Sequence, residues 1–352
     1  MERPERLPVA GFQRKAGRKA PDAEASNVPP PAKFLFPCIS TTILNLFPKS
    51  VIIDATTSLG ETSMLRSLLF IPGNNPAMLL NADIHGADGI ILDLEDAVAI
   101  DQKDAARLLV KNAVATMGYT TPHLIIRVNP LDTDFCRADL KTAVPLRPAF
   151  IMPTKVGSAE EVERLGVLIA EIEETHGIPS GSTALMPLLE TARGIENAYA
   201  IACAPRVRAL LLGAEDYTAD LHAIRSKESG EIAYARGRVL NAARAAGIEA
   251  IDTPFTDVND QEGLRADAAH ARTLGFTGKA SISPRHIDDI NRAFSPSENE
   301  VRYAQEVLLT IEEGRRLGKG AVSLRGKMID KPIVDRARQT LETAKALGME
   351  VE

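Results

Sequence analysis

ALMPLLETARG (Ala184–Gly194) is one of two stretches that decide the fold of this chain, and ALLLGAEDY (Ala209–Tyr217) is the other. Each is a short apolar run that ends in a carboxylate, Glu190 in the first and Asp216 in the second. Apolar runs of this length, bounded by glycine or by charge, are typical of buried parallel strands. Residues 192–203 have a helical pattern and are long enough for one crossover connection. We therefore expect the two carboxylates at the same end of two neighbouring strands.

Two carboxylates on rigid elements that face one opening suit a hard divalent cation such as Mg²⁺, with Mn²⁺ as an alternative. The pattern therefore predicts a metal site at Glu190 and Asp216. A structural role is the alternative, because strand-end carboxylates also cap helices or pair with a neighbouring arginine, here Arg193.

From Met64 onward, apolar runs alternate with amphipathic stretches, which is typical of βα units and a parallel sheet. Eight strands are expected, at 67–71, 89–92, 124–128, 149–152, 184–189, 209–212, 249–252 and 278–282. Helices are expected between them, among others at 103–117, 159–175, 231–246 and 261–274. This succession predicts a (β/α)₈ TIM barrel over residues 64–294. An open doubly wound sheet is the alternative, but Pro72-Gly73-Asn74-Asn75 is not the glycine-rich turn of a dinucleotide site.

Two segments flank the predicted barrel. Residues 1–63 are expected to be a disordered or dispensable extension, because the first part is rich in Pro, Arg, Lys and Ala without periodicity. The uncharged run Phe34–Pro48 is too short to span a bilayer. Residues 295–352 are expected to form a C-terminal helical lid, or an arm for oligomer assembly, with a glycine-flanked break between two helices. Pro332 is well placed to open the second of them.

Composition excludes several classes of function. The net charge of −6 and the 4% of aromatic residues argue against nucleic acid as a partner, and no segment predicts a membrane span. The three cysteines have no metal-ligand spacing and indicate a reducing compartment. A cytoplasmic protein is therefore expected. A mitochondrial matrix location would follow if residues 1–63 were a transit peptide, against which Glu2, Glu5 and Asp22 argue.

Charged residues gather where the predicted strands end, and in a (β/α)₈ barrel the C-terminal strand ends carry the active site. They follow the strands in this order along the chain: Asp93, Glu95 and Asp96; Arg127; Lys155; Glu190; Asp216; Asp252. Arg127 offers a planar fork for a substrate carboxylate. The alternative is an ion pair with Glu95 or Asp96 alone, and the two roles are compatible, because such a pair would orient the guanidinium. A metal and an arginine together suit the binding of a 2-keto acid and the stabilisation of enolate or alkoxide charge.

Arg66 and Lys155 are the cations for which other roles are expected. Lys155 at a strand end has the chemistry to form a Schiff base, but Arg66 and Lys155 fit phosphate contacts better. No Ser-His-Asp set and no HExxH spacing emerges from the six histidines.

A series of motifs runs in one order through residues 64–345: RSLLFIPGNNPAML, GADGIILDLEDAV, IIRVNP, MPTKV, PLLETARG, LLLGAEDYTADL, EAIDTPFTD, GFTGKASISPRHI and GKMIDKP. On these motifs the chain resembles the citrate lyase β-subunit-like acyl-CoA lyases of the HpcH/HpaI aldolase superfamily. One departure is Ser283, which stands before Pro284 where members of the family often carry His.

The resemblance implies a barrel with a C-terminal lid, assembled as a homotrimer or hexamer. It implies Mg²⁺ on Glu190 and Asp216 and a keto-acid carboxylate on Arg127. CoA would lie across the barrel mouth. The roles that the resemblance implies for single residues are catalysis by Asp330 on the lid, which is often presented to a neighbouring subunit, with Arg127, Glu95 and Asp96; substrate binding by Arg127, Glu190, Gly213, Ala214 and Pro254; and CoA contacts by Arg66, Asn75 and Lys155.

The activity that the resemblance implies is a reversible, Mg²⁺-dependent carbon–carbon cleavage. A 3-hydroxyacyl-CoA such as citryl-CoA or malyl-CoA would give a 2-keto acid and acetyl-CoA or propionyl-CoA, with Asp330 exchanging the proton at the thioester α-carbon. Two alternatives stay open: a malyl-CoA-type thioesterase, and the β subunit of a multi-subunit citrate lyase that acts on a carrier-bound thioester.

Overall fold

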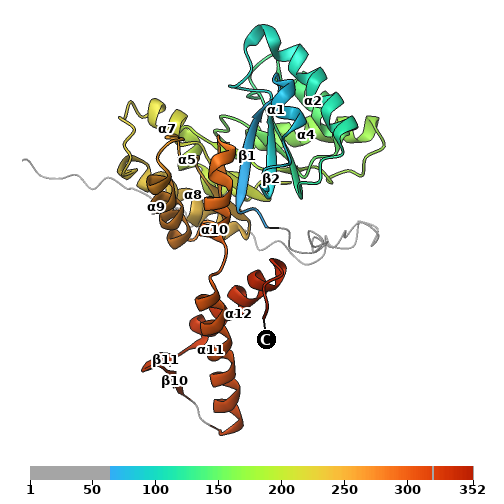
Figure 1. Ribbon diagram of the computed structural model, residues 1–352. Helices are drawn as coiled ribbons and strands as arrows, with labels where there is room; N and C mark the ends of the chain where they lie inside the picture. The colour runs from blue at the N-terminus through green and yellow to red at the C-terminus, as the bar shows by residue number, and fades with distance from the viewer. Residues whose placement is uncertain (1–63, 319–320, 352) are drawn as a thin grey trace, which may run out of the picture. The chain divides into compact units, whose positions relative to one another are not determined.

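The computed structural model describes residues 64–318 and 321–351. Its central feature is a parallel sheet surrounded by helices (Figure 1). The strands in chain order are β1 (Ser67–Pro72), β2 (Gly89–Asp93), β3 (His123–Val128), β4 (Phe150–Pro153), β5 (Ala184–Leu185), β6 (Leu188–Leu189), β7 (Ala209–Leu212), β8 (Glu249–Asp252) and β9 (Gly278–Ser281). The sheet order is β5-β4-β3-β2-β1-β9-β8-β7-β6.

The two ends of this order, β5 and β6, are halves of one barrel strand. Only Met186 and Pro187 separate them, and Pro187 has no N–H to donate to the sheet. The first half pairs with β4 and the second with β7. Leu185 also forms a bridge with Val207, just before β7. The strand therefore has neighbours on both sides, and eight parallel strands close into a ring, as a (β/α)₈ barrel requires.

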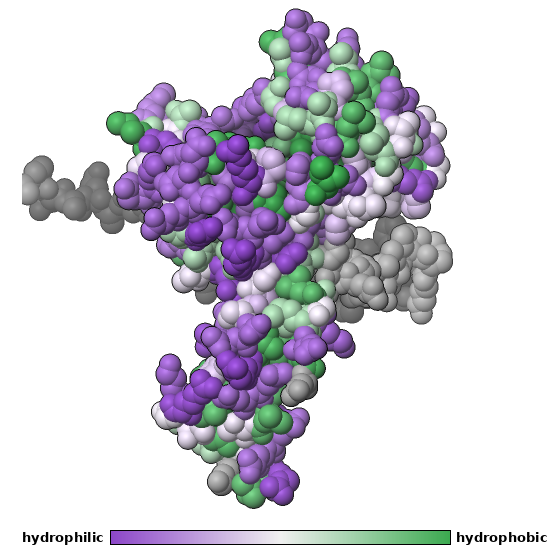
Figure 2. All heavy atoms as spheres, in the orientation of Figure 1, coloured by the Kyte–Doolittle hydropathy of each residue, from purple (hydrophilic) through white to green (hydrophobic). Residues whose placement is uncertain are grey.

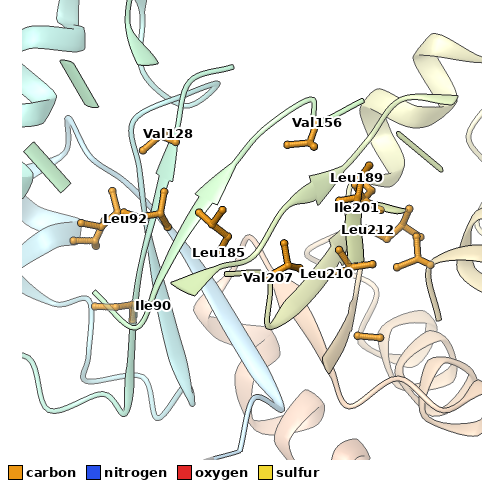
Figure 3. Packing of buried hydrophobic residues seen from close by; sticks show 14 of the residues in the cluster. Ile90, Leu92, Val128, Val156, Leu185, Leu189, Ile201, Val207, Leu210 and Leu212 are labelled. Atoms are coloured by element: carbon orange, nitrogen blue, oxygen red, sulfur yellow. The ribbon is translucent and has the colours of Figure 1, made fainter. Parts of the chain in front are cut away.

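Alternation along the strands sends side chains to two hydrophobic layers. Inside the barrel, a compact cluster includes Leu68, Ile91, Ile125, Phe150 and Ile251. Outside it, a larger cluster packs the strands against the helices. Figure 3 shows part of this outer layer, including Ile90, Leu92, Val128, Leu210 and Leu212. Because both faces of most strands are apolar, these strands appear as continuous hydrophobic runs in the sequence; β9 is the exception, since Lys279 and Ser281 are buried within it.

The helices of the barrel are α1 (Pro76–Leu80), α2 (Lys103–Met117), α3 (Cys136–Ala143), α4 (Ala159–Thr175), α5 (Ala192–Glu196), α6 (Ala198–Ala202), α7 (Ala214–Asp220), α8 (Ala233–Ala246), α9 (Gln261–Leu274) and α10 (Ile287–Phe294). The predictions for 103–117, 159–175 and 261–274 are confirmed at both ends. The single helix expected at 192–203 is wrong in detail, since it breaks into α5 and α6 at Asn197.

The C-terminal segment consists of α11 (Glu298–Arg316), a β10 (Val322–Leu324) and β11 (Lys327–Ile329) hairpin, and α12 (Lys331–Ala346). Its own apolar cluster joins both helices to the hairpin through Val307, Ile329 and Val334, among others. Two helices around a break were expected, but the hairpin was not. The three-residue strands are too short to show alternation in the sequence.

The barrel prediction is confirmed, because the sheet closes with the expected strands in the expected order. The predicted extension, residues 1–63, lies outside the described residues. In the part of the chain that the structure describes, no helix is long and apolar enough to cross a membrane. The face of the molecule seen in Figure 2 is mostly hydrophilic, with apolar side chains in small, scattered patches.

Candidate active site

A cavity of about 300 Å³ opens at the C-terminal ends of the strands. One side is polar and the other apolar. The polar wall includes Asp93, Asp96, Arg127, Glu190 and Asp216, and the apolar wall includes Phe70, Leu188, Leu211, Pro254 and Ile282. Residues from opposite sides of the barrel therefore meet at one opening, because every parallel strand ends at the same rim.

Arg127, at the end of β3, is the main cation of the polar wall. Its Nε and Nη2 donate to the two carboxylate oxygens of Asp93 at 2.7 and 2.5 Å, and its Nη1 lies 3.2 Å from Glu95 Oε2. Its guanidinium also lies over the ring of Phe70, 4.9 Å from the centroid. Burial acts to lower the pKa of Arg127, but Asp93 and the other carboxylates raise it overall. The arginine is thus a fixed positive charge with a set orientation.

Lys155 links the polar groups on three strand ends. Its Nζ donates to Glu95 Oε1 at 2.6 Å and lies 3.4 Å from Asp216 Oδ2 and 3.6 Å from Asp96 Oδ1. Its backbone N–H donates to Glu190 Oε1 at 2.8 Å. Its φ of 54° is in the left-handed region, where a non-glycine residue is uncommon and stored strain often accompanies function.

Glu190 is almost completely buried at the end of β6. Burial raises the pKa of Glu190 to about 8, and the charges of Asp216 and Glu95 add to this effect, although Lys155 opposes it. Next to it, Gly213 approaches so closely that a Cβ there would lie 2.7 Å from Glu190 Cβ and 2.8 Å from its Oε2. Gly213 is therefore required by the side chain of Glu190.

The pKa values of Glu95 and Asp96 are shifted in opposite directions. Burial raises the pKa of Glu95, although Arg127 and Lys155 oppose the change. Burial also acts to raise the pKa of Asp96, but its hydrogen bond with Glu95 and the charge of Lys155 lower it overall. Neighbouring carboxyl groups whose pKa values are moved apart are typical of sites that transfer protons.

The residues present fit a divalent cation. Five carboxylates meet here, from Asp93, Glu95, Asp96, Glu190 and Asp216, and the cations in contact with them are Arg127 and Lys155, with Lys103 on the backbone carbonyls of Leu94 and Glu95. Negative charge is therefore in excess, and it adds to the effect of burial in raising the pKa of Glu190. Within the described residues, no three acidic, His or Cys side chains form a ready-made metal group. Two carboxylates with open positions for water and substrate are the usual arrangement for Mg²⁺.

The structure brings most of the predicted site residues together. Arg127, Glu190, Asp216, Gly213, Ala214, Pro254 and Asp96 line the mouth cavity, and Glu95 and Lys155 lie directly behind its polar wall in an adjoining groove of about 790 Å³.

Three predicted residues are not among those that line the mouth cavity or the groove. Arg66 precedes β1 at the opposite end of the barrel, where its guanidinium pairs with Asp88 and donates to Ser295, so it is not a residue of the mouth. Asn75 accepts from Met78 N and caps α1. Asp330 caps α12 by accepting from Ile333 N, and it lines a cavity within the C-terminal segment.

Two further residues of the site, Asp93 and Thr253, have no role assigned from the sequence. Asp93 follows a predicted strand, but its pairing with Arg127 depends on the register between β2 and β3, which places the two residues side by side. Thr253 lines the cavity and accepts the backbone N–H of Ala214. Its position after the seventh barrel strand was the available signal.

Comparison with known proteins shows similarity over most of the chain. The family model described as HpcH/HpaI aldolase/citrate lyase matches residues 66–284. The citrate lyase subunit beta of Haemophilus influenzae is 44% identical over 282 residues, which is 80% of this chain and 97% of that protein. A (3S)-malyl-CoA thioesterase of Cereibacter sphaeroides is 35% identical over 80% of this chain and 95% of its own length.

Among solved structures, protein CitE of Mycobacterium tuberculosis in complex with magnesium, acetoacetate and coenzyme A is 30% identical, with a TM-score of 0.66, over 80% of this chain and 99% of that one.

Proposed function

Because the chain belongs to the HpcH/HpaI aldolase/citrate lyase family, we propose that it is a Mg²⁺-dependent carbon–carbon lyase. Its substrate is a 3-hydroxyacyl thioester of CoA, such as citryl-CoA or malyl-CoA, and its products are a 2-keto acid and acetyl-CoA or propionyl-CoA. One observation carries the proposal: Glu190 and Asp216, on neighbouring strand ends, line the same cavity as Arg127.

The acidic residues and the arginine bind different groups. Glu190 and Asp216 would hold the metal, which when bound supplies Lewis-acid stabilisation of oxygen charge at the 3-hydroxy carbon. Arg127 binds the substrate carboxylate. Its contacts with Asp93 and Glu95 engage three of its five N–H groups. The guanidinium is therefore oriented before substrate enters and still has N–H groups to donate.

The chemistry requires two proton movements. The hydroxyl loses its proton as the bond between the α- and β-carbons breaks, and the thioester enolate gains one at its α-carbon, so no net proton is consumed. We assign the second transfer to Asp330, which caps α12 with one carboxylate oxygen and is exposed. Lys155 remains a candidate CoA contact, because its exposed side chain lies in the groove that adjoins the mouth.

Two other functions are consistent with the relatives. A thioesterase would release free CoA and a hydroxy diacid, and one relative carries that name. A subunit of a multi-subunit citrate lyase would act on a carrier-bound thioester. Chain length does not separate the second possibility from a stand-alone enzyme, since the match covers 97% of a protein named citrate lyase subunit beta.

The test is to mix the purified chain with Mg²⁺ and a panel of 3-hydroxyacyl-CoA thioesters and to follow the products by mass spectrometry. Formation of a keto acid that is lost in Glu190→Ala and Asp330→Ala would support the proposal. Free CoA without keto acid would identify a thioesterase. No turnover of any CoA ester, but cleavage of a carrier-bound thioester, would identify a subunit of a larger enzyme.

We also propose that the chain forms a homotrimer or hexamer in which Asp330 serves the mouth of a neighbouring copy. Co-expression of Glu190→Ala with Asp330→Ala then restores part of the activity, because some mixed assemblies contain one intact mouth and one intact Asp330. If the mixed oligomers recover no activity, Glu190 and Asp330 of the same subunit act in one active site, and the proposal is wrong.

A further inference from the structure

The helix that carries Asp216 lacks a cap of its own. Helix α7 begins at Ala214, and its N-cap residue is Gly213, which makes no side-chain hydrogen bond to the helix. Some other helices of this barrel are capped locally, among them α4, where Ser158 accepts from Glu161 N, and α9, where Asp260 accepts from Gly263 N. A side-chain oxygen at this position normally satisfies one of the free N–H groups of the first turn.

Glu190 is the reason that α7 cannot be capped in the ordinary way. A Cβ on Gly213 would lie 2.7 Å from Glu190 Cβ, closer than real side chains approach. Ser, Thr, Asp and Asn, the residues that cap helices, are therefore all excluded from position 213. The close approach of the two carboxylate-bearing strand ends thus removes the local cap.

Thr253 takes over this function from the next strand. Its Oγ1 accepts the backbone N–H of Ala214 at 3.1 Å, and the hydroxyl lies at the end of β8 with the residue almost completely buried. Ala214 is two residues before Asp216, and Thr253 lines the same cavity as Asp216 and Glu190. The bond therefore ties the start of α7 to β8 at the point where Asp216 is directed into the mouth.

We propose that Thr253 is a positioning residue for the metal pair: its hydroxyl fixes the first turn of α7 and so sets the place of Asp216 opposite Glu190. This inference rests on the metal site of the proposed function. The far end of α7 is held separately, because Asp220 accepts the backbone N–H of Ala192 at 2.7 Å. Loss of the Thr253 bond therefore loosens the metal-binding end of the helix, where the backbone bond from Gly213 N to Leu189 O is left, and leaves the other end attached.

The test measures binding of Mn²⁺ alone to the full-length protein, by electron paramagnetic resonance of the free ion. Thr253→Val keeps the shape of the side chain and removes the hydroxyl. We expect it to weaken Mn²⁺ binding about fivefold, the size of a typical capping effect. Thr253→Ser keeps the hydroxyl and is expected to bind Mn²⁺ as the wild type does. If Thr253→Val does not fold, Thr253→Ala replaces it with the same expectation.

Thr218→Val is the matched control. Thr218 is a buried residue of the same helix, and its Oγ1 donates to Ala214 O at 2.9 Å, but it does not line the cavity. A purely structural role of these hydroxyls predicts that both valine variants lower the melting temperature and leave Mn²⁺ affinity unchanged. The proposal predicts weaker Mn²⁺ binding only for the Thr253 variant.

Equal Mn²⁺ affinity in wild type and Thr253→Val, or no rescue by serine, would overturn the inference and leave the proposed function standing. Asp216→Asn is measured beside them to separate the two failures. If that variant still binds Mn²⁺ as tightly as the wild type, the metal site itself is wrong.

Discussion

Mn²⁺ binding to the metal-free protein is expected to depend steeply on pH, because the ion competes with a proton on Glu190. Burial and the charges of Asp216 and Glu95 raise the pKa of this carboxyl to about 8. A carboxylate must be ionised to bind a metal. At pH 7 the group is therefore mainly protonated, and each bound Mn²⁺ displaces close to one proton, about 0.9 for a pKa of 8.

The size of the effect follows from the same pKa. About half of the Glu190 carboxyls are ionised at pH 8 and about one in a hundred at pH 6. The apparent affinity for Mn²⁺ should therefore fall about fiftyfold between pH 8 and pH 6. A glutamate with the ordinary pKa of 4.5 would be fully ionised over this range and would produce almost no change.

Isothermal titration calorimetry provides both quantities. Titrations at pH 6, 7 and 8 give the affinity, and a pair of buffers with different ionisation enthalpies at pH 7 gives the number of protons released. Glu190→Gln is the control, because it cannot release this proton and should bind Mn²⁺ weakly with little pH dependence. A wild-type affinity that is constant from pH 6 to pH 8, or the absence of proton release at pH 7, would refute the reasoning.

Three further outcomes are expected. The raised pKa of Glu190 means that folding favours the protonated carboxyl; its stabilising contribution is fully present below pH 4.5 and is lost as the pH rises through about 8. With metal removed by EDTA, the melting temperature should therefore fall more between pH 5 and pH 8 for the wild type than for Glu190→Gln, and parallel profiles would contradict this. Gly213→Ala places a Cβ against Glu190 and should lower Mn²⁺ affinity at least about tenfold and stability by about 1–3 kcal/mol, whereas an unchanged binding isotherm would show that the strand ends move apart freely. Arg127→Lys keeps the charge but loses the two-point contact with Asp93, so kcat/KM should fall about a hundredfold with little change in Mn²⁺ affinity; near-normal kinetics would remove Arg127 from carboxylate binding.

The eight barrel strands and several helix ends could be predicted because they depend on local order. Parallel strands buried on both faces appear as unbroken apolar runs, and Gly247 and Gly275 stop α8 and α9 in left-handed conformations that glycine adopts readily. The same local pattern placed Glu190 and Asp216 at strand ends. Because residues at the C-terminal ends of barrel strands meet at one rim, the two carboxylates were expected to converge. Both line the cavity at the mouth.

Arg66 shows where this reasoning failed. Its charge and its position beside a strand suggested a phosphate contact, but the direction of β1 puts it at the wrong end of the barrel, on Asp88. The hairpin between α11 and α12 was also beyond prediction, because two strands of three residues carry no periodicity. The roles of Asp330 and of the predicted oligomer stay predictions.

The sequence by itself determined the barrel, its rim and the kinds of charge that collect there, because strand order and side-chain alternation are properties of short segments. Only the tertiary structure decided which of those charges meet. Asp93 orients Arg127 across 34 residues of sequence, the backbone of Lys155 reaches Glu190 across 35, and Thr253 caps α7 across 39. These contacts depend on strand register and on loop conformation, which are set when the sheet closes. No short segment of sequence predicts them.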